Sequence, residues 1–327
     1  MLETGKSYAR YFLDVFRHLR HPLFENRFVN QLRGDKRRDL VPRDFFRGLP
    51  DDYYYWLMTF SHNLGQQAGG LIPEIPPAHI QRTWTGSAGQ TTFQQAFVFY
   101  QRILKWIERY SEKPTEKLEV LDFGSGWGRI IRFFLRDVPH SQLHGTDCWQ
   151  EIVESSRSLN RWCSFDINST LPPMQYADQS FDLVYLYSVF SHLSEAAHLA
   201  WLGEFRRLLR PGGLLVTTTR PRRFLQILSA SRDAHSSKGM YYSATAGEAF
   251  PDIQGTLQRY DRGEFCFSPT GGGGPLTSDF YGEACIPVRY VREKWAGIEL
   301  LAVSRPDRLI DQTVFCCRKI PPHQNAV

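Results

Sequence analysis

Short apolar runs alternate with segments of helical spacing through the middle of this chain. The spacing predicts helices over residues 130–136, 151–159 and 195–209. The apolar runs predict strands at residues 118–123, 142–146, 162–166, 181–187 and 214–219. Strands that alternate with helices imply a parallel sheet with right-handed crossovers, which is an α/β fold.

Two further strand-like runs close the chain. Residues Ile298–Ser304 and Gln312–Lys319 are separated by a turn that contains Arg305-Pro306-Asp307-Arg308, which predicts a terminal hairpin. We therefore expect a Rossmann-like α/β fold with a seven-stranded, mostly parallel sheet and an antiparallel terminal hairpin.

The segments outside this alternation predict additions to the fold. Helical patterns at Tyr8–Leu19 and Phe93–Tyr110 predict a helical N-terminal extension or cap over residues 1–115. Residues 221–287 break the alternation and carry the run Gly271–Gly274, which predicts an inserted substrate lid. The remaining residues, 116–220 and 288–327, then form the Rossmann-like domain.

The distribution of charge bears on the partners. The net charge is +5, and residues 1–50 contain eleven Lys/Arg against six Asp/Glu, so 11 − 6 = +5 and the rest is balanced. Nucleic-acid enzymes carry a wider basic surface, so we expect no nucleic-acid partner. The basic helix at Tyr8–Leu19 either packs on the main domain or contacts a membrane surface or partner.

Localisation and metal content follow from what the sequence lacks. No apolar run is long enough to span a bilayer, and no apolar signal segment begins the chain, so a cytoplasmic protein is expected. The six cysteines form no CxxC pair and no paired spacing with histidine, which predicts reduced thiols and no metal site.

A glycine turn follows the first predicted strand. Its glycines, Gly124, Gly126 and Gly128, form G-x-G-x-G, whereas dinucleotide-binding proteins use G-x-G-x-x-G to approach a pyrophosphate. Arg129 breaks that pattern, which favours a ligand without phosphate. Asp147, at the end of the second strand, is placed to accept hydrogen bonds from both hydroxyls of a ribose. The glycine turn and Asp147 together predict a nucleoside-binding site.

Four segments in this order, VLDFGSGWGR, HGTDCWQ, DQSFDLVYLYSVFSHLSE and FRRLLRPGGLLVTTT, resemble the motifs of class I S-adenosylmethionine-dependent methyltransferases. TVFCCRK resembles the antiparallel last strand of that fold. The resemblance covers about residues 118–219 and 288–320. It implies S-adenosyl-L-methionine as cofactor and S-adenosyl-L-homocysteine as product.

The resemblance also implies a role for individual residues. Asp147 would hold the ribose, either Asp166 or Asn168 would meet the adenine amine, and Ser188 would lie beneath the sulfonium. The methionine and adenosyl portions would be lined by Asp122, Gly124, Ser125, Gly126, Trp127 and Gly128, with Cys148 and Trp149 beside the adenine. Turn chemistry alone adds Thr85 and Gly86 as residues that close over the cofactor.

Methyl transfer to an alcohol requires a base for the departing proton. His192, in the loop after the fourth strand, is the preferred general base, and it alternatively packs or caps the next helix. Further candidates in the insertion are His235, Tyr241, Tyr242, Asp261 and Glu264. Three arginines after the fifth strand, Arg220, Arg222 and Arg223, either meet an acidic or phosphorylated acceptor or form a solvated charge run.

The loop after the fourth strand narrows the acceptor. It reads Tyr187-Ser188-Val189-Phe190, so it lacks the Asn/Asp-Pro-Pro-Tyr stretch of amino-methylating enzymes that act on adenine or glutamine. It also lacks the Pro-Cys of pyrimidine C5 enzymes and the carboxylate cluster of metal-dependent catechol-type enzymes. We therefore expect O-methylation of a small molecule or of a sugar or glycan hydroxyl, with N-methylation a weaker expectation. An NAD(P)-type dinucleotide-binding oxidoreductase and a non-catalytic binding protein with the same fold are the alternatives.

Overall fold

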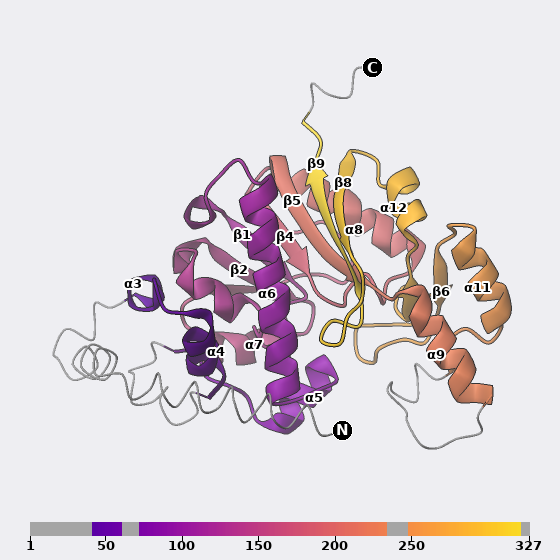
Figure 1. Ribbon diagram of the computed structural model, residues 1–327, viewed down its shortest axis with the longest axis horizontal. Coiled ribbons are helices and arrows are strands. Elements are labelled where there is room, and N and C mark those ends of the chain that lie inside the picture. Colours follow the sequence, from indigo (N-terminus) through magenta and orange to yellow (C-terminus); the bar gives the residue numbers. More distant parts are fainter. Residues whose placement is uncertain (1–40, 61–71, 234–247, 322–327) are drawn as a thin grey trace.

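The computed structural model describes residues 41–60, 72–233 and 248–321 (Figure 1). The predicted helix at Tyr8–Leu19 and the candidates His235, Tyr241 and Tyr242 lie outside these residues. No helix within the described ranges combines the length and apolar character needed to cross a bilayer.

The expected sheet is confirmed. Seven strands lie in the order β3-β2-β1-β4-β5-β9-β8, with β9 antiparallel to both β5 and β8 and the other neighbours parallel. Their bounds are β1 Val120–Phe123, β2 Leu143–Asp147, β3 Ser164–Ile167, β4 Phe181–Leu186, β5 Leu209–Thr219, β8 Ile298–Ser304 and β9 Thr313–Lys319. The order places β1 and β4 at the centre, so their carboxyl ends meet in the middle of one sheet edge.

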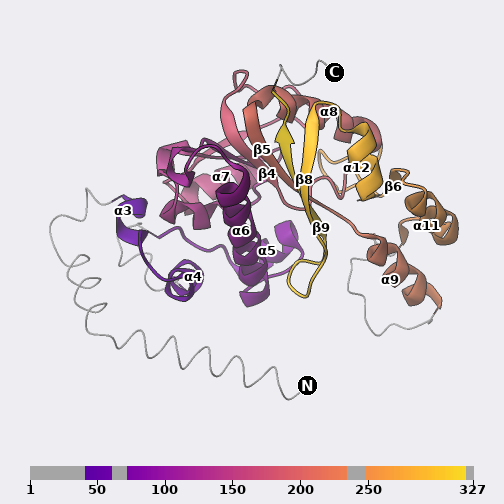
Figure 2. The same cartoon turned by 45° about the horizontal axis from the view of Figure 1, so that its top comes forward.

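Helices cover both faces of this sheet (Figures 1 and 2). Successive residues of β4 point to opposite faces: Leu183 and Tyr185 join one apolar core with α6, and Val184 and Leu186 join a second core with α8. The helices of the main body are α3 Pro42–Phe46, α4 Asp51–Phe60, α5 Ala78–Thr85, α6 Gln90–Tyr110, α7 Gln150–Leu159, α8 Glu195–Leu208 and α12 Val288–Lys294, with short 3₁₀ turns at Thr115–Lys117 (η3) and His140–Gln142 (η5).

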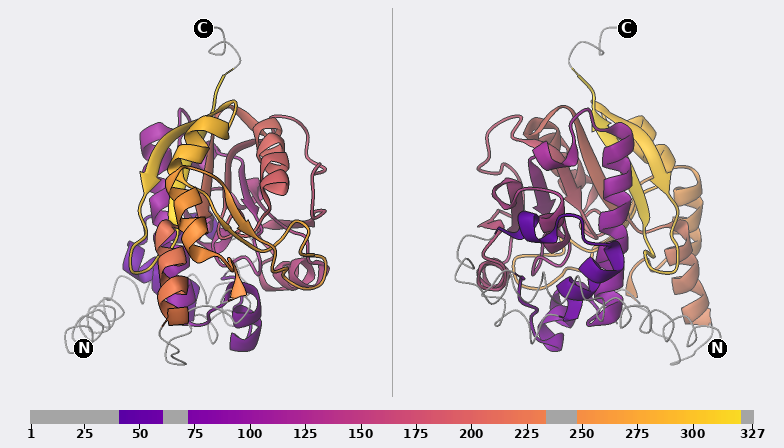
Figure 3. Two further views of the ribbon diagram at one scale, coloured as in Figure 1. Left: turned by 90° about the vertical axis from the view of Figure 1, so that its right-hand side faces the viewer. Right: turned by 60° about the vertical axis from the view of Figure 1, so that its left-hand side comes forward.

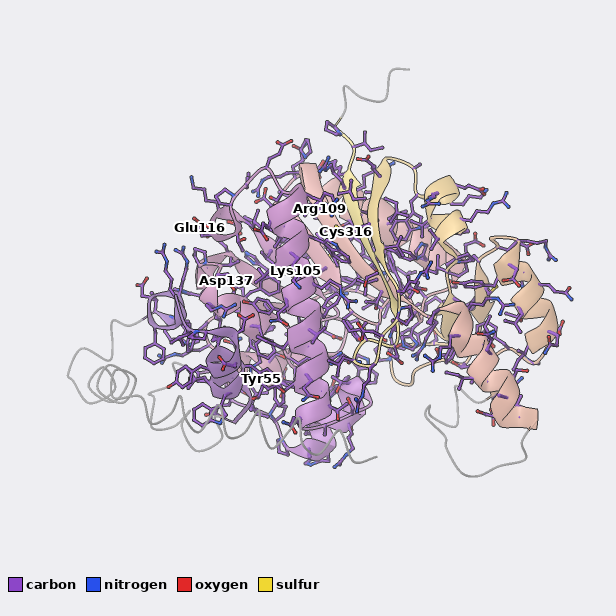
Figure 4. All side chains as sticks on the ribbon, in the orientation of Figure 1. Tyr55, Lys105, Arg109, Glu116, Asp137 and Cys316 are labelled. Carbon is purple, nitrogen blue, oxygen red and sulfur yellow. The ribbon has the colours of Figure 1, made fainter. Side chains whose placement is uncertain are left out.

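Helix α6 shows why residues before the sheet belong to its packing. Ile103 and Ile107 are buried in the core with Tyr185, while Lys105 and Arg109 are exposed on the outward face of the helix (Figure 4). This one-sided pattern is that of an amphipathic helix covering a sheet. The predicted extension therefore supplies a structural layer, and the domain boundaries themselves remain a prediction.

Two sequence-based expectations are corrected. The helix predicted up to Arg136 is the 3₁₀ helix η4, Ile131–Arg136. The reason is local: Gly124, Gly126 and Gly128 all have positive φ, which interrupts helical backbone geometry directly after β1. The bonds that follow span three or four residues, as in Phe133 N–H to Ile130 O and Val138 N–H to Phe134 O. Strand β5 begins at Leu209, because the predicted turn Arg210–Gly213 is absorbed as an irregularity in its pairing with β4.

The insertion has a small core of its own. It contains α9 Arg222–Asp233, α11 Ile253–Asp261, β6 Cys266–Ser268 and β7 Glu283–Cys285, and β6 pairs antiparallel with β7. In Figure 1 α9 and α11 lie beside the sheet, on the side of β8, and the left view of Figure 3 shows the insertion (orange) from that side. Backbone bonds tie it to the loop after β4: Gly282 N–H donates to His192 O (2.7 Å), and Ala284 N–H donates to Ser191 O (2.7 Å). The insertion therefore helps to shape the loop that carries the predicted base.

Candidate active site

The glycine turn after β1 is packed tightly between its neighbours. A Cβ at Gly124 would lie 2.5 Å from Val189 Cγ2, and one at Gly128 would lie 3.1 Å from Phe165 Cζ. The backbone N–H groups of Gly124 and Ser125 both donate to Thr146 O, at 2.8 and 2.9 Å. Glycine is required here for both its φ and its lack of a side chain.

Asp147 is held at the rim of this turn. Gly126 N–H donates to its Oδ2 (3.1 Å) and Trp149 N–H donates to its Oδ1 (3.2 Å). Burial raises the pKa of Asp147, and these backbone donors oppose the rise. Since each carboxylate oxygen has two acceptor positions, the group retains acceptors for the hydroxyls of a ligand.

Residues from three parts of the chain, two tryptophans and a glycine, meet beside Asp147. The rings of Trp84 and Trp149 lie edge to face with centroids 5.2 Å apart, and a Cβ at Gly274 would lie 2.1 Å from Trp149 Cη2. The expected residue Gly86 ends α5 in a left-handed conformation, and a Cβ there would meet no atom within 4 Å. The contact with Trp149 therefore comes from Trp84 in the same turn, which the sequence analysis missed.

Cys148 lies in the same group and is partly buried. Burial raises the pKa of its thiol to about 12, so the thiol stays neutral at physiological pH. At its expected place beside the adenine, Cys148 would therefore be an uncharged group that packs against the ligand.

Asp122 and Trp127 occupy buried positions around the turn. Burial raises the pKa of Asp122 to about 7, and its Oδ2 has no hydrogen-bond partner among the described residues. The Trp127 side chain is 2% exposed and packs edge to face against Phe93, with ring centroids 5.6 Å apart. Trp127 thus belongs to the core beneath the turn, and both its Nε1 and Asp122 Oδ2 are buried polar atoms without a hydrogen-bond partner among the described residues.

The structure separates the two candidates after β3. Asp166 is exposed, accepts a hydrogen bond from Tyr176 Oη (3.0 Å) and lies 3.5 Å from Arg157 Nη2. Asn168 N–H donates to Asp147 O (3.0 Å), and its side-chain Oδ1 is buried without a partner among the described residues. Of the two candidates, Asn168 is therefore the residue whose backbone is hydrogen-bonded to Asp147.

His192 lies at the carboxyl end of β4 with its tautomer defined. Its Nδ1 is 2.8 Å from the carbonyl oxygen of Gly282, so Nδ1 carries the proton and Nε2 keeps its lone pair. Nε2 lies 3.4 Å from Ser188 Oγ, which accepts a hydrogen bond from Gln312 Nε2 (2.8 Å). Burial lowers the pKa of His192 while the Glu283 carboxylate opposes that effect, which favours the neutral ring.

The structure also separates the charged candidates within the insertion and at the end of β5. Arg220 Nε lies 3.0 Å from Glu283 Oε2, close to His192. Arg222 is paired with Asp261 (2.7 Å), Glu264 is paired with Arg259 and Arg262, and Arg223 is exposed. Only Arg220 of the three arginines is thus joined to the groups around His192. Tyr281, Glu283 and Gln312 are site residues that the sequence analysis did not single out.

The family model and two curated relatives that this chain matches are all described as methyltransferases. Residues 120–213 match the family model of a methyltransferase domain. A malonyl-[acyl-carrier protein] O-methyltransferase of Paenibacillus sp. is 27% identical over 143 residues, which are 41% of this chain and 50% of the relative. An uncharacterised methyltransferase of Schizosaccharomyces pombe is 30% identical over 112 residues, or 31% of this chain and 38% of the relative. The chain therefore spans half or less of the length of these curated relatives.

Among solved structures, a Pyrococcus horikoshii protein superposes with a TM-score of 0.42 at 17% identity, over 68% of this chain and 91% of that chain. This likeness is loose, and the class rests on the family match and on the sheet order. The match over residues 120–213 and the sheet order both support the class I S-adenosylmethionine-dependent methyltransferase superfamily. Residues 214–327, which include Tyr281, Glu283 and Gln312, lie outside the matched range.

Proposed function

We propose that this chain transfers a methyl group from S-adenosylmethionine to a hydroxyl group of a small molecule or glycan, with His192 as the general base. The observation that carries the proposal is the bond between His192 Nδ1 and Gly282 O (2.8 Å). It leaves the lone pair of Nε2 available at the carboxyl end of β4, where ligands bind in folds of this kind. A fixed, neutral imidazole suits an acceptor that must lose a proton during attack.

The residues around the glycine turn fit the cofactor. Asp147 offers carboxylate acceptors for the ribose hydroxyls, and the unpartnered Oδ1 of Asn168 offers an acceptor for the adenine amine. Trp149 and Trp84 would supply apolar surface for the adenine, and the backbone of Gly124–Gly128 would hold the methionine portion. When bound, S-adenosylmethionine supplies an electrophilic methyl group on a sulfonium.

The chain's own residues then have definite tasks. Nε2 of His192 takes the proton from the acceptor hydroxyl, and Gln312 orients Ser188 next to that nitrogen. Gly274 lies against Trp149 and Tyr281 stacks on His192, so the insertion shields part of both side chains from water. Positioning and desolvation of this kind are the main contributions that an enzyme makes to an in-line displacement.

The remaining expectations belong to the same proposal. We infer a cytoplasmic protein with a small-molecule or glycan acceptor and no nucleic-acid partner. The balanced charge of residues 51–327 supports this view, since a nucleic-acid site would require an excess of basic groups. Membrane or partner contact by residues 1–50 is a second proposal that rests on their basic excess alone.

The test is label transfer from methyl-labelled S-adenosylmethionine to panels of sugars, glycosides and hydroxylated metabolites. We expect transfer to oxygen, and a rate about 10²-fold to 10⁴-fold lower in His192→Gln than in the wild type, because general-base catalysis contributes that much. His140→Gln, at the start of η5, is the control and should keep the wild-type rate. An unchanged rate in His192→Gln, or label found on nitrogen, would contradict the proposal.

A further inference from the structure

Three consecutive residues of the insertion enclose the His192 ring. The Tyr281 ring stacks on it with centroids 5.2 Å apart and an interplanar angle of 9°. The carbonyl oxygen of Gly282 accepts from Nδ1 (2.8 Å), and Glu283 Oε1 lies 3.6 Å from the same nitrogen. All three residues lie outside the range that matches the methyltransferase family model.

The two oxygens of Glu283 face different partners. Oε1 faces His192, while Oε2 accepts a hydrogen bond from Arg220 Nε (3.0 Å). The Glu283 side chain is 8% exposed, so its charge is shielded little by solvent, and the guanidinium compensates for it. Arg220 also lies 3.9 Å from Asp311, a more exposed carboxylate.

From this arrangement we propose that Glu283 is a positioning residue for His192, so that the insertion completes the base that the methyltransferase core provides. When Nε2 takes the proton of an acceptor hydroxyl, the ring becomes a cation that retains its own Nδ1 proton. A buried cation is costly unless an opposite charge lies nearby, and Glu283 is the carboxylate next to Nδ1. The role in catalysis rests on the proposed function, whereas the effect on His192 itself does not.

Each element around the His192 ring supplies a group that can affect the protonation of the ring. The insertion supplies the Glu283 carboxylate and the Tyr281 phenol, and the end of β5 supplies the Arg220 guanidinium. The loop of His192 itself supplies the neutral Ser188 hydroxyl. Glu283 favours the protonated ring and Arg220 disfavours it, so exchange of either one should move the titration of His192 in a direction known beforehand.

The experiment is an NMR pH titration of the full chain with ¹⁵N-labelled histidine, and His192→Gln identifies the signal. We expect the wild type to show the Nδ1–H tautomer at high pH. In Glu283→Gln the measured pKa of His192 should fall by about one unit or more, a tenfold loss in proton affinity. Asp311→Asn also removes a carboxylate next to Arg220 but has no contact with His192, so it should leave that pKa nearly unchanged.

Conservative and opposite variants complete the design. Glu283→Asp keeps the charge and should restore most of the shift, and Arg220→Gln should raise the pKa of His192. Equal shifts in Glu283→Gln and Asp311→Asn, or an Nε2–H tautomer in the wild type, would overturn the proposal. If Glu283→Gln does not fold, a failure of Arg220→Gln to raise the pKa overturns it equally. Because no cofactor or acceptor is present, failure of the proposed function would show separately, as absence of cofactor-product binding.

Discussion

The indole ring of Trp149 lies directly against the backbone of Gly274, with 2.1 Å between Trp149 Cη2 and the place where a Cβ would stand. This contact joins the end of β2 to the glycine run of the insertion. Since Trp149 lies two residues after Asp147, Gly274 covers the nucleoside side of the proposed cofactor site. The insertion thus reaches both ends of the site, through Gly274 at one and Tyr281 at the other.

A side chain at position 274 should therefore open the site. We predict that Gly274→Ala weakens binding of S-adenosylhomocysteine about tenfold, because the new methyl group displaces the run from Trp149. Gly273→Ala is the matched control: both glycines have positive φ (49° for Gly274 and 81° for Gly273), but a Cβ at Gly273 meets nothing within 4 Å. Isothermal titration calorimetry measures both. Equal losses in the two variants would assign the effect to backbone strain and contradict the predicted contact.

Asp122 should make the stability of the ligand-free protein depend on pH. Burial raises its folded-state pKa to about 7 from 3.8, so its contribution to stability is complete below pH 4 and is lost as the pH rises through 7. At about 1.4 kcal/mol per pKa unit the loss is on the order of 4 kcal/mol. Asp122→Asn should match the wild type near pH 4 and unfold at higher urea concentration near pH 8.

The control for this prediction is a second buried aspartate. Asp182 accepts hydrogen bonds from Lys113 (2.6 Å) and Arg210 (2.6 Å), so Asp182→Asn should destabilise the protein near neutral pH, because it leaves two cations without their partner. The measurement is urea unfolding of the wild type and of Asp122→Asn at pH 4 and pH 8. An equal difference from the wild type at pH 4 and pH 8 would show that Asp122 is not the titrating group.

Much of the sheet could be predicted because its signals are local. The strand at 181–187 is apolar on both faces, since Leu183 and Val184 are buried in different cores, and such runs are readable without tertiary information. Glycine spacing with Asp147 downstream placed the turn correctly for the same reason. The backbone state of 131–136 was not readable, because positive φ at three glycines decides where helical bonds begin.

The missed site residues share a different cause. Tyr281 and Glu283 lie next to His192 because backbone hydrogen bonds and one isolated antiparallel bridge join residues 280–284 to residues 191–194. The two segments are separated in sequence by α8, β5 and most of the insertion. Gln312 reaches Ser188 only because β9 lies beside β5. Trp84 could have been found, since it directly precedes Thr85 and Gly86, which turn chemistry indicates. Contacts between segments so far apart leave no spacing pattern within one sequence.

The central claim is that the turn around Asp147 binds the nucleoside of S-adenosylmethionine. Calorimetry of S-adenosylhomocysteine binding to the wild type, Asp147→Ala and Asp166→Ala tests it most directly. Asp166, at the end of the neighbouring strand β3, is engaged with Arg157 and Tyr176 and serves as the matched control. The account predicts saturable binding to the wild type, near-normal binding to Asp166→Ala and loss of binding in Asp147→Ala. No binding to the wild type, or equal binding to all three proteins, would contradict it.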